Sequence, residues 1–243
     1  MFNVTIVNKD ELKNFFKYYG ETAAVCYNTD PKYANGVGKS CLQTEHFSGS
    51  RHRYIVIKFE NISRACADQI ARHSVGTALN MKSFRYVPLH NFDYHTPPLI
   101  LKNPKAKEIY DKHMKATQIA YSEICEALES DGYKGEKVYE CARGVAPMNA
   151  YTSMVMGFTP EALINFLNKR LCVCSQYEIQ QVAKKVREIV LSEIPELSDK
   201  LVAICQRQLW CPESPKRSCG AYPQKDELKL ALSEYRAKRK GNT

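Results

Sequence analysis

Hydrophobic positions recur with the period of an α-helix along much of the chain. Between Pro104 and Glu129, apolar residues follow one another three or four positions apart, which predicts a long amphipathic helix. The same spacing, with Asp10 and Thr159 as candidate N-caps, predicts several further helices. These are expected at residues 10–19, 63–76, 137–142, 159–169 and 175–194.

Shorter runs of β-branched and aromatic residues predict strands at 4–7, 54–60 and 151–158. Asn, Asp, Gly and Pro cluster over 28–40, which predicts a loop, and a short polar segment runs through 77–86. The chain has no internal repeat and no regular alternation of strand and helix. We therefore expect the α+β class rather than a doubly wound parallel sheet.

Composition and charge restrict the function. Hydrophobic residues make up 44% of the 243, no apolar run is long enough to span a bilayer, and the first residues lack a signal-peptide pattern. We therefore expect a cytoplasmic protein with no membrane partner. The net charge of +9 is compatible with a non-catalytic nucleic-acid-binding protein, which stays open as an alternative. Part of that charge lies in the tail at 225–243, where a basic run is usually a solvated helix end.

Four arginines indicate an anionic ligand. Arg72, Arg85, Arg143 and Arg170 lie in or beside apolar segments that are expected to pack, and a buried guanidinium needs an anionic partner. A salt bridge to Asp or Glu would satisfy any one of them, but four together favour a bound anion. The glycine-rich loops that cradle phosphate are absent from the sequence, as are the G-x-S-x-G and H-E-x-x-H motifs.

Ten cysteines are many for this length. Cys66 and Cys125 lie in apolar helical segments and are expected to pack in the core. The C-terminal half holds another group: Cys172, Cys174, Cys205, Cys211 and Cys219. Zinc ligands usually come in pairs two to four residues apart, and the gaps between the last three are wider. Packed or loop thiols are therefore favoured, no metal site is predicted, and structural zinc is the less favoured alternative.

One segment holds Arg72-His73-Ser74 and, further on, Asn80, Ser83 and Arg85-Tyr86. It resembles the signature of the flavin-dependent thymidylate synthases (ThyX family), which reads R-H-R, a short spacer and then S-x-N-E-x-S-x-R-Y. Further stretches resemble that family in the same order, so the resemblance covers about residues 20–190. They are the residues around His46-Phe47-Ser48 and His52, the helix Ser63–His73, Glu140–Pro147, Asn165–Arg170 and Gln176–Ile179.

The resemblance implies a fold and a reaction. It implies mixed helices with a small, mostly antiparallel sheet, a catalytic domain at 1–195, a cysteine-containing extension at 196–243, and a homotetramer with FAD bound between subunits. It also implies methylation of dUMP at C5 to dTMP, with methylenetetrahydrofolate as carbon donor and NADPH as reductant. No cysteine nucleophile takes part in such a reaction, and no nucleic-acid partner is expected.

The resemblance also assigns residues. Arg170 would be catalytic and would activate the base; it would also contact the substrate. The other expected contacts to the nucleotide are Gln69, Arg72, Ser83, Arg85 and Arg143. The expected contacts to FAD are Ser48, Arg72, His73, Ser74 and Asn165.

The chain departs from the family pattern at Arg51, Ser74, Met81 and Phe84. These departures fall on positions to which the resemblance assigns flavin or nucleotide contacts. Met81 and Phe84 motivate an alternative in which the protein methylates or hydroxymethylates C5 of another pyrimidine nucleotide.

Overall fold

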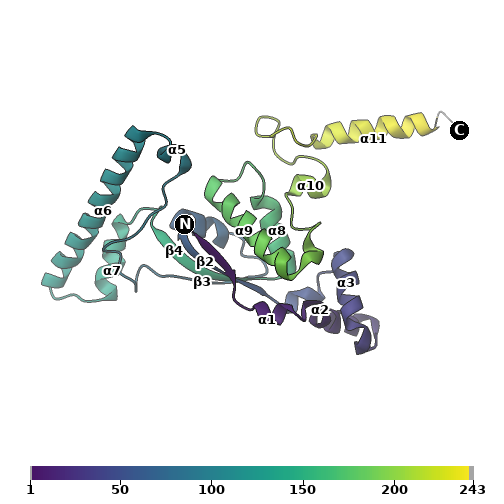
Figure 1. Ribbon diagram of the computed structural model, residues 1–243, viewed down its shortest axis with the longest axis horizontal. Coiled ribbons are helices and arrows are strands. Elements are labelled where there is room, and N and C mark those ends of the chain that lie inside the picture. The colour runs from purple at the N-terminus through teal and green to yellow at the C-terminus, as the bar shows by residue number, and fades with distance from the viewer. Residues whose placement is uncertain (1, 241–243) are drawn as a thin grey trace. The chain divides into compact units, whose positions relative to one another are not determined.

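The computed structural model describes residues 2–240, and the chain in it forms two compact units (Figure 1). The first unit comprises Met1–Asp10 with Tyr54–Thr159, and the second comprises Glu11–Arg53 with Pro160–Thr243. Each unit therefore combines two stretches that are distant in sequence. The predicted boundary at residue 195 stays a prediction.

A four-stranded sheet forms the centre of the first unit. Its strands are β1 (Asn3–Ile6), β2 (Ile55–Ser63), β3 (Thr77–Met81) and β4 (Tyr151–Phe158), in the order β1-β2-β4-β3. All three pairings are antiparallel. The predicted α+β class is confirmed, and so are the three predicted strands, to within a few residues at their ends.

Alternation of side chains along β2 explains how the sheet buries one face. Ile55, Ile57 and Phe59 are fully buried, and they lie two residues apart, as the pleat of a strand requires. The register against β4 shifts between Phe59 and Ile62, where Asn61 adopts a positive φ of 54°. This irregularity bends the strand just before it leads into the next helix.

Helices complete the first unit: α4 (Arg64–Ala71), α5 (Pro98–Leu101), α6 (Pro104–Ser130) and α7 (Glu136–Ala142), followed by the 3-10 turn η4 (Arg143–Val145). The helices α6 and α7 lie side by side (Figure 1). Together with the segment 84–92 they enclose a hydrophobic cluster that includes Phe84, Tyr121 and Val138. The cluster fixes the segment after β3 against α7, and this arrangement positions the site described below.

The second unit is helical. It holds α2 (Phe15–Ala24), α3 (Ala34–Gln43), α8 (Pro160–Arg170), α9 (Tyr177–Glu193), α10 (Ile204–Gln208) and α11 (Lys225–Lys240), and α1 (Lys9–Leu12) leads into it. The 3-10 turns η1 (Val25–Tyr27), η2 (Pro31–Tyr33), η3 (Gly49–His52) and η5 (Pro195–Leu197) connect them. A Cβ at Gly20 would collide with the carbonyl oxygen of Ala34, and one at Gly38 with that of Phe16. These two glycines therefore let α2 and α3 pack backbone against backbone.

Three sequence expectations need correction. Residues 28–40 are not a loop throughout, because η2 and α3 begin there, and the Asp30 carboxylate accepts a hydrogen bond from Lys32 N at 2.9 Å. The predicted helix at 10–19 is two helices, α1 and α2. The polar segment after Gly76 contains β3, whose pairing with β4 compensates for a weak strand pattern.

Two further expectations concern the basic C-terminal tail and membrane-spanning helices. The basic tail is helical as α11 up to Lys240, and positions 241–243 of the predicted tail lie outside the described residues. Over residues 2–240, no helix combines the length and the apolar character that crossing a bilayer would need.

Candidate substrate cleft and flavin contacts

The signature segment, residues 72–86, begins where α4 ends. The Ser63 hydroxyl accepts a hydrogen bond from Cys66 N at 3.0 Å and so caps the start of α4. Arg72 is the C-cap, and the chain turns at Gly76 with a φ of 70° before β3 begins. Helix end, turn and edge strand therefore present the segment at the surface of the first unit.

A cleft of about 620 Å³ lies beside the end of this segment, and we call it the Ser83 cleft. Ser83 and Met81 come from the segment itself, whereas Glu140 and Arg143 come from α7 and η4. Its remaining lining is Arg64, Lys82, Phe84, Gly144, Ala146, Pro147 and Met148. Two of the predicted nucleotide contacts, Ser83 and Arg143, therefore lie in one cavity.

Three cations line the Ser83 cleft, and two of them are unpaired. Within residues 2–240, neither the Lys82 ammonium nor the Arg143 guanidinium has a hydrogen-bond or ion-pair partner. Arg64 is engaged, since its Nε lies 3.1 Å from the Asp68 carboxylate and its guanidinium lies over the Phe84 ring, 5.6 Å from the centroid. The two free cations give the cleft an affinity for an anion such as a phosphate.

Arg85 is held by carboxylates. Its Nε donates to Glu140 at 2.8 Å, and its Nη2 lies 3.5 Å from Glu136. The charge of Glu136, followed by the hydrogen bond and charge of Glu140, raises the pKa of the Arg85 guanidinium above its usual value. The Ser83 hydroxyl accepts a hydrogen bond from Arg85 N at 3.2 Å, which fixes the position of Ser83. Arg85 therefore orients Ser83 and Glu140 at the wall of the cleft.

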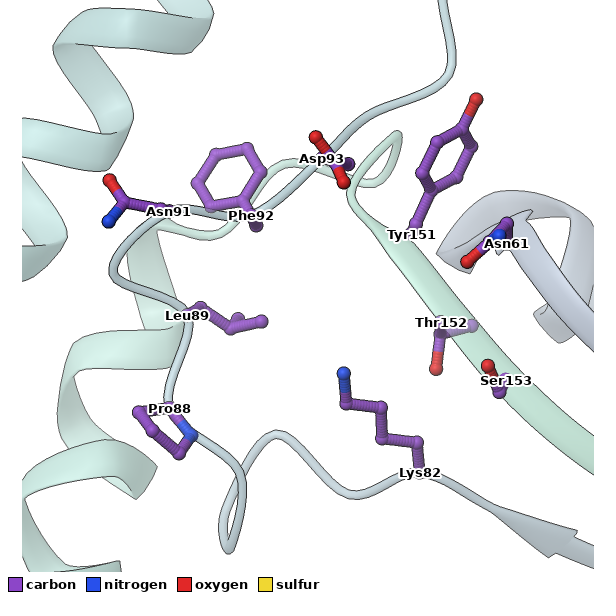
Figure 2. A pocket seen from close by; sticks show the side chains of 10 residues that line it. All are labelled: Asn61, Lys82, Pro88, Leu89, Asn91, Phe92, Asp93, Tyr151, Thr152 and Ser153. Atoms are coloured by element: carbon purple, nitrogen blue, oxygen red, sulfur yellow. The ribbon is translucent and has the colours of Figure 1, made fainter. Parts of the chain in front are cut away.

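A second, smaller cavity of about 220 Å³ shares Lys82 with the Ser83 cleft, and we call it the Thr152 cavity. Figure 2 shows Lys82 extending into it from one side, with Asp93 and Thr152 on the others. Thr152 is 2% exposed, and its hydroxyl has no hydrogen-bond partner among the residues that the structure describes. Within residues 2–240, the Asp93 carboxylate forms no ion pair.

Three residues of these cavities were not predicted from the sequence: Lys82, Asp93 and Thr152. Lys82 stands at a variable position of the family signature, and only the pairing of β3 with β4 brings it beside Thr152. Its location inside the signature segment, next to Ser83, was the one available signal. No pattern in the sequence marks Asp93 or Thr152.

The other predicted residues of the first unit lie near the end of α4. Gln69 and His73 are partly buried there, and Arg72 and Ser74 are exposed. None of the four lines the Ser83 cleft. The side chains of Arg72 and Ser74 have no partner within the described residues. These exposed guanidinium and hydroxyl donors are therefore open to an anionic ligand.

Three predicted residues belong to the second unit. Ser48 precedes η3 and is exposed, Asn165 is exposed on α8, and Arg170 is the partly buried last residue of α8. Arg51, one of the departures from the family pattern, forms a salt bridge with Glu161 at 2.9 Å. That departure therefore adds an ion pair inside the unit.

The expectation that all four arginines are buried is wrong. Arg72 and Arg143 are exposed, whereas Arg85 and Arg170 are partly buried. The apolar residues beside each arginine do pack, as Ile70 and Ala142 show by being fully buried. On a helix end, however, the next residue can point outward, so burial of one residue says little about its neighbour.

Comparison with known proteins gives consistent matches. Residues 10–196 match the family described as thymidylate synthase complementing protein. The flavin-dependent thymidylate synthase of Nitratidesulfovibrio vulgaris is 34% identical over 189 residues, which cover 78% of this chain and 77% of that protein. That of Clostridium tetani is 30% identical over 193 residues, 76% of each chain. That of Thermococcus onnurineus is 29% identical over 192 residues, 75% and 74% of the two chains.

Proposed function

Since the chain belongs to the thymidylate synthase complementing protein family and its relatives are flavin-dependent thymidylate synthases, we propose that it methylates dUMP at C5 to give dTMP. The family makes the chain a methyltransferase and a flavoprotein. The observation that carries the substrate assignment is the Ser83 cleft, where the signature serine lies with two unpaired cations, Lys82 and Arg143. A nucleoside monophosphate supplies the anion that these groups lack.

In this proposal the cations of the cleft bind the phosphate. Arg143 offers a forked pair of donors that matches two phosphate oxygens, and Lys82 adds a mobile point charge. The Ser83 hydroxyl, oriented by Arg85 N, is free to donate its proton to the nucleotide. Gln69 and Arg72, at the end of α4, do not line the cleft, and their assignment as nucleotide contacts rests on the resemblance to the family signature.

Arg170 acts on the pyrimidine base. Its guanidinium cannot lose its proton at working pH, so it cannot be a general base. It stabilises the negative charge that collects on the O2 and N3 edge of the uracil, and this makes C5 a better nucleophile. No cysteine attacks the base, because the reaction needs no covalent link to the protein.

FAD supplies the redox chemistry when it is bound. We assign its binding to Ser48, Arg72, His73, Ser74 and Asn165, following the resemblance to the family. Methylenetetrahydrofolate and NADPH are the proposed co-substrates. The proposed assembly is a homotetramer with FAD between subunits. Light scattering during size-exclusion chromatography would test it by measuring the molar mass.

Absorbance and turnover test the function. We expect the purified protein to be yellow, with a flavin absorbance band, and to form dTMP from dUMP only when methylenetetrahydrofolate and a reductant are present. UMP and dCMP should be poor substrates. Turnover of one of these in place of dUMP would overturn the substrate assignment. A colourless protein whose affinity for DNA or RNA falls steeply with salt would instead indicate nucleic-acid binding without catalysis.

A pair of ligands tests the cleft separately from catalysis. dUMP should bind more tightly than deoxyuridine, which lacks the phosphate, by about 10–100-fold, the value of charge-assisted hydrogen bonds. Calorimetric titration of the flavin-loaded protein measures both affinities. Equal affinity for the two ligands would show that Lys82 and Arg143 do not contact the phosphate.

A further inference from the structure

A segment beyond the residues that match the family contacts the elements that carry two of the expected flavin contacts. This segment, 200–207, leads into α10 and bonds to α8 and to the loop 44–52, which follows α3 and which we call the Ser48 loop. We propose that Arg207 is a positioning residue that holds Ser48 and Asn165 in place for flavin binding. This inference rests on the proposed function, which assigns both residues to FAD.

Arg207 lies between α8 and the Ser48 loop. Its guanidinium donates from Nη1 to Asn168 Oδ1 at 2.9 Å and from Nη2 to the Glu45 carboxylate. Asn168 lies on α8, three positions after Asn165. Glu45 lies in the Ser48 loop, three positions before Ser48. One planar side chain therefore joins the two elements, and the fixed geometry of its donors also fixes their separation.

The contacts on the α8 side are buried. Asn168 is only 4% exposed, and its amide nitrogen donates to the carbonyl oxygens of Lys200 and Val202 at 2.8 and 2.7 Å. Buried hydrogen-bonding groups are costly to leave unpaired, so these bonds hold the segment firmly against α8. Residues three positions apart are neighbours on a helix surface. Fixing Asn168 therefore also fixes the turn that presents Asn165.

Helix α2 fixes the middle of the Ser48 loop. The Tyr19 hydroxyl donates to the carbonyl oxygen of His46 at 2.6 Å, and the Thr22 hydroxyl donates to that of Gly49 at 2.9 Å. Tyr19 is fully buried, so its hydrogen bond is shielded from water. These contacts hold the backbone on both sides of Ser48 against α2. The position of the loop relative to α8 depends on other contacts.

Ion pairs connect the Ser48 loop with other segments, and they differ in burial. Arg51 pairs with Glu161 in the first turn of α8, but the two side chains are 62% and 45% exposed, and such a pair contributes little. Glu45 contacts both Arg207 and Lys200, and the Lys200 side chain is only 6% exposed. Glu45 also has a φ of 61°, which a non-glycine residue keeps only where its surroundings hold it. Arg207, unlike Arg51, therefore links the loop to buried groups.

FAD affinity and local protection test the role of Arg207 in the full-length protein. Arg207→Ala should weaken binding of FAD to flavin-stripped protein by about 10-fold, because the Ser48 loop must then be ordered on binding. Quenching of flavin fluorescence measures this affinity. In the flavin-free variant, backbone amides of the Ser48 loop should exchange with solvent faster than in wild type. Their increase should exceed that of the amides of α9, which report on the stability of the whole unit.

Lys39→Ala is the matched control. It removes an ion pair of 2.9 Å between α3 and Glu196 of η5, and it leaves the contacts of Arg207 intact. It should change neither the FAD affinity nor the exchange of the Ser48 loop. The preference for dUMP over deoxyuridine reports on the Ser83 cleft and should stay at its wild-type value in both variants. Should Arg207→Ala fail to fold, Glu45→Gln, which keeps the shape of the side chain, should weaken FAD binding in the same direction.

Two results would overturn the inference. If Arg207→Ala and Glu45→Gln bind FAD as tightly as wild type, Arg207 does not position the flavin contacts. If Lys39→Ala weakens FAD binding equally, any loosening of the C-terminal segment has this effect and the role of Arg207 is merely structural. Wild-type protein that binds no FAD would contradict the proposed function and this inference together, whereas tight wild-type binding with unaffected variants contradicts the inference alone.

Discussion

A charge network in the second unit and the Ser83 cleft in the first unit differ in whether their cations have partners. In the second unit, Lys200 is only 5% exposed, and its ammonium lies 3.4 Å from the Glu45 carboxylate. Arg207 contacts the same carboxylate and donates to Asn168 Oδ1 at 2.9 Å. Asn168 in turn donates to the carbonyl oxygens of Lys200 and Val202 at 2.8 and 2.7 Å. Each of these polar groups has a partner within the protein.

In the first unit, Lys82 and Arg143 line the Ser83 cleft without an ion-pair partner in the described chain. Cations that are paired within the protein stabilise the fold, whereas unpaired cations are available to bind a ligand. A buried charge without a partner costs several kcal/mol, and the Lys200 ammonium avoids that cost by lying beside the carboxylates of Glu45 and Asp199. Exposed cations remain hydrated and can be left open at little cost. We therefore expect changes to the packing and the charge network of the second unit to alter stability, and changes in the Ser83 cleft to alter nucleotide binding.

The largest effect on stability is expected where α2 packs on α3. Gly38→Ala places a methyl group against the backbone oxygen of Phe16, which cannot move without displacing α2. Such overpacking against backbone should lower the free energy of unfolding by about 3 kcal/mol or more. Urea unfolding monitored by circular dichroism measures the change.

Gly36→Ala is the matched control on the same helix. A Cβ there meets nothing within 4 Å, so alanine should stabilise α3 by about 0.5–1 kcal/mol through its higher helix propensity. Equal effects of the two substitutions would mean that the close packing of α2 on α3 does not determine stability.

In the cleft, Arg143→Ala should weaken dUMP binding by about 10–100-fold and leave the unfolding free energy within about 0.5 kcal/mol of wild type. The physical reason is the loss of a forked, charge-assisted contact to phosphate from a side chain that has no partner in the protein. The affinity for deoxyuridine should not change. Calorimetric titration with both ligands separates phosphate recognition from a general disturbance of the cleft.

Arg51→Ala is the matched control for an arginine that is paired. Its guanidinium binds Glu161 and should not affect the dUMP affinity. If Arg143→Ala destabilised the protein while nucleotide binding persisted, the contrast between the two units would fail.

Sequence patterns predicted the segments in which residue propensity and the pattern of buried positions indicate the same secondary structure. The period of hydrophobic positions was enough for α6, α8 and α9, and β-branched runs were enough for β2 and β4. They failed for α3, because Gly36 and Gly38 signal a loop locally, whereas Gly38 lets the backbones of α2 and α3 approach. They failed for β3 because that strand depends on its pairing with β4.

Some features of the candidate site could be predicted from the sequence and others could not. The signature predicted Ser83 and Arg143, which share a cleft. It could not reveal that Arg85 is held by Glu136 and Glu140, since these carboxylates come from α7, about fifty residues away. It also could not reveal Lys82 as an unpaired cation. Which cations are unpaired depends on contacts between distant segments, and no local pattern encodes them.

A smaller effect is expected from the charge network of the second unit. Burial alone would raise the pKa of the Glu45 carboxyl, but the hydrogen bond and charge of Arg207, together with Lys200, outweigh it and hold the pKa below its usual value. A lowered folded-state pKa adds stability above the unfolded-state value, about 4.3, and that stability is lost as the pH falls through the folded-state value. Unfolding free energies measured from pH 7 down to pH 3 should show this loss.

Glu45→Gln should remove that part of the acid dependence and cost about 1–2 kcal/mol at neutral pH, a value reduced because the Glu45 side chain is 45% exposed. Glutamine keeps the shape of the side chain, and it replaces a residue whose backbone has a φ of 61° without adding strain of its own. An unchanged pH profile in this variant would show that Lys200 and Arg207 do not depend on the carboxylate.

The smallest effect should come from Thr152, a polar group that is buried in the first unit and still unpaired. Its hydroxyl has no partner among the described residues, so Thr152→Val removes an uncompensated polar atom and keeps the volume. We expect the ligand-free protein to gain up to about 1 kcal/mol of stability. Thr152→Ser keeps the hydroxyl and serves as the control. If valine instead destabilised the protein while serine did not, the hydroxyl would be bonded to an ordered water in the Thr152 cavity. Lys82 and Arg143 would then remain unpaired groups that bind a ligand, whereas Thr152 would be a group paired with water.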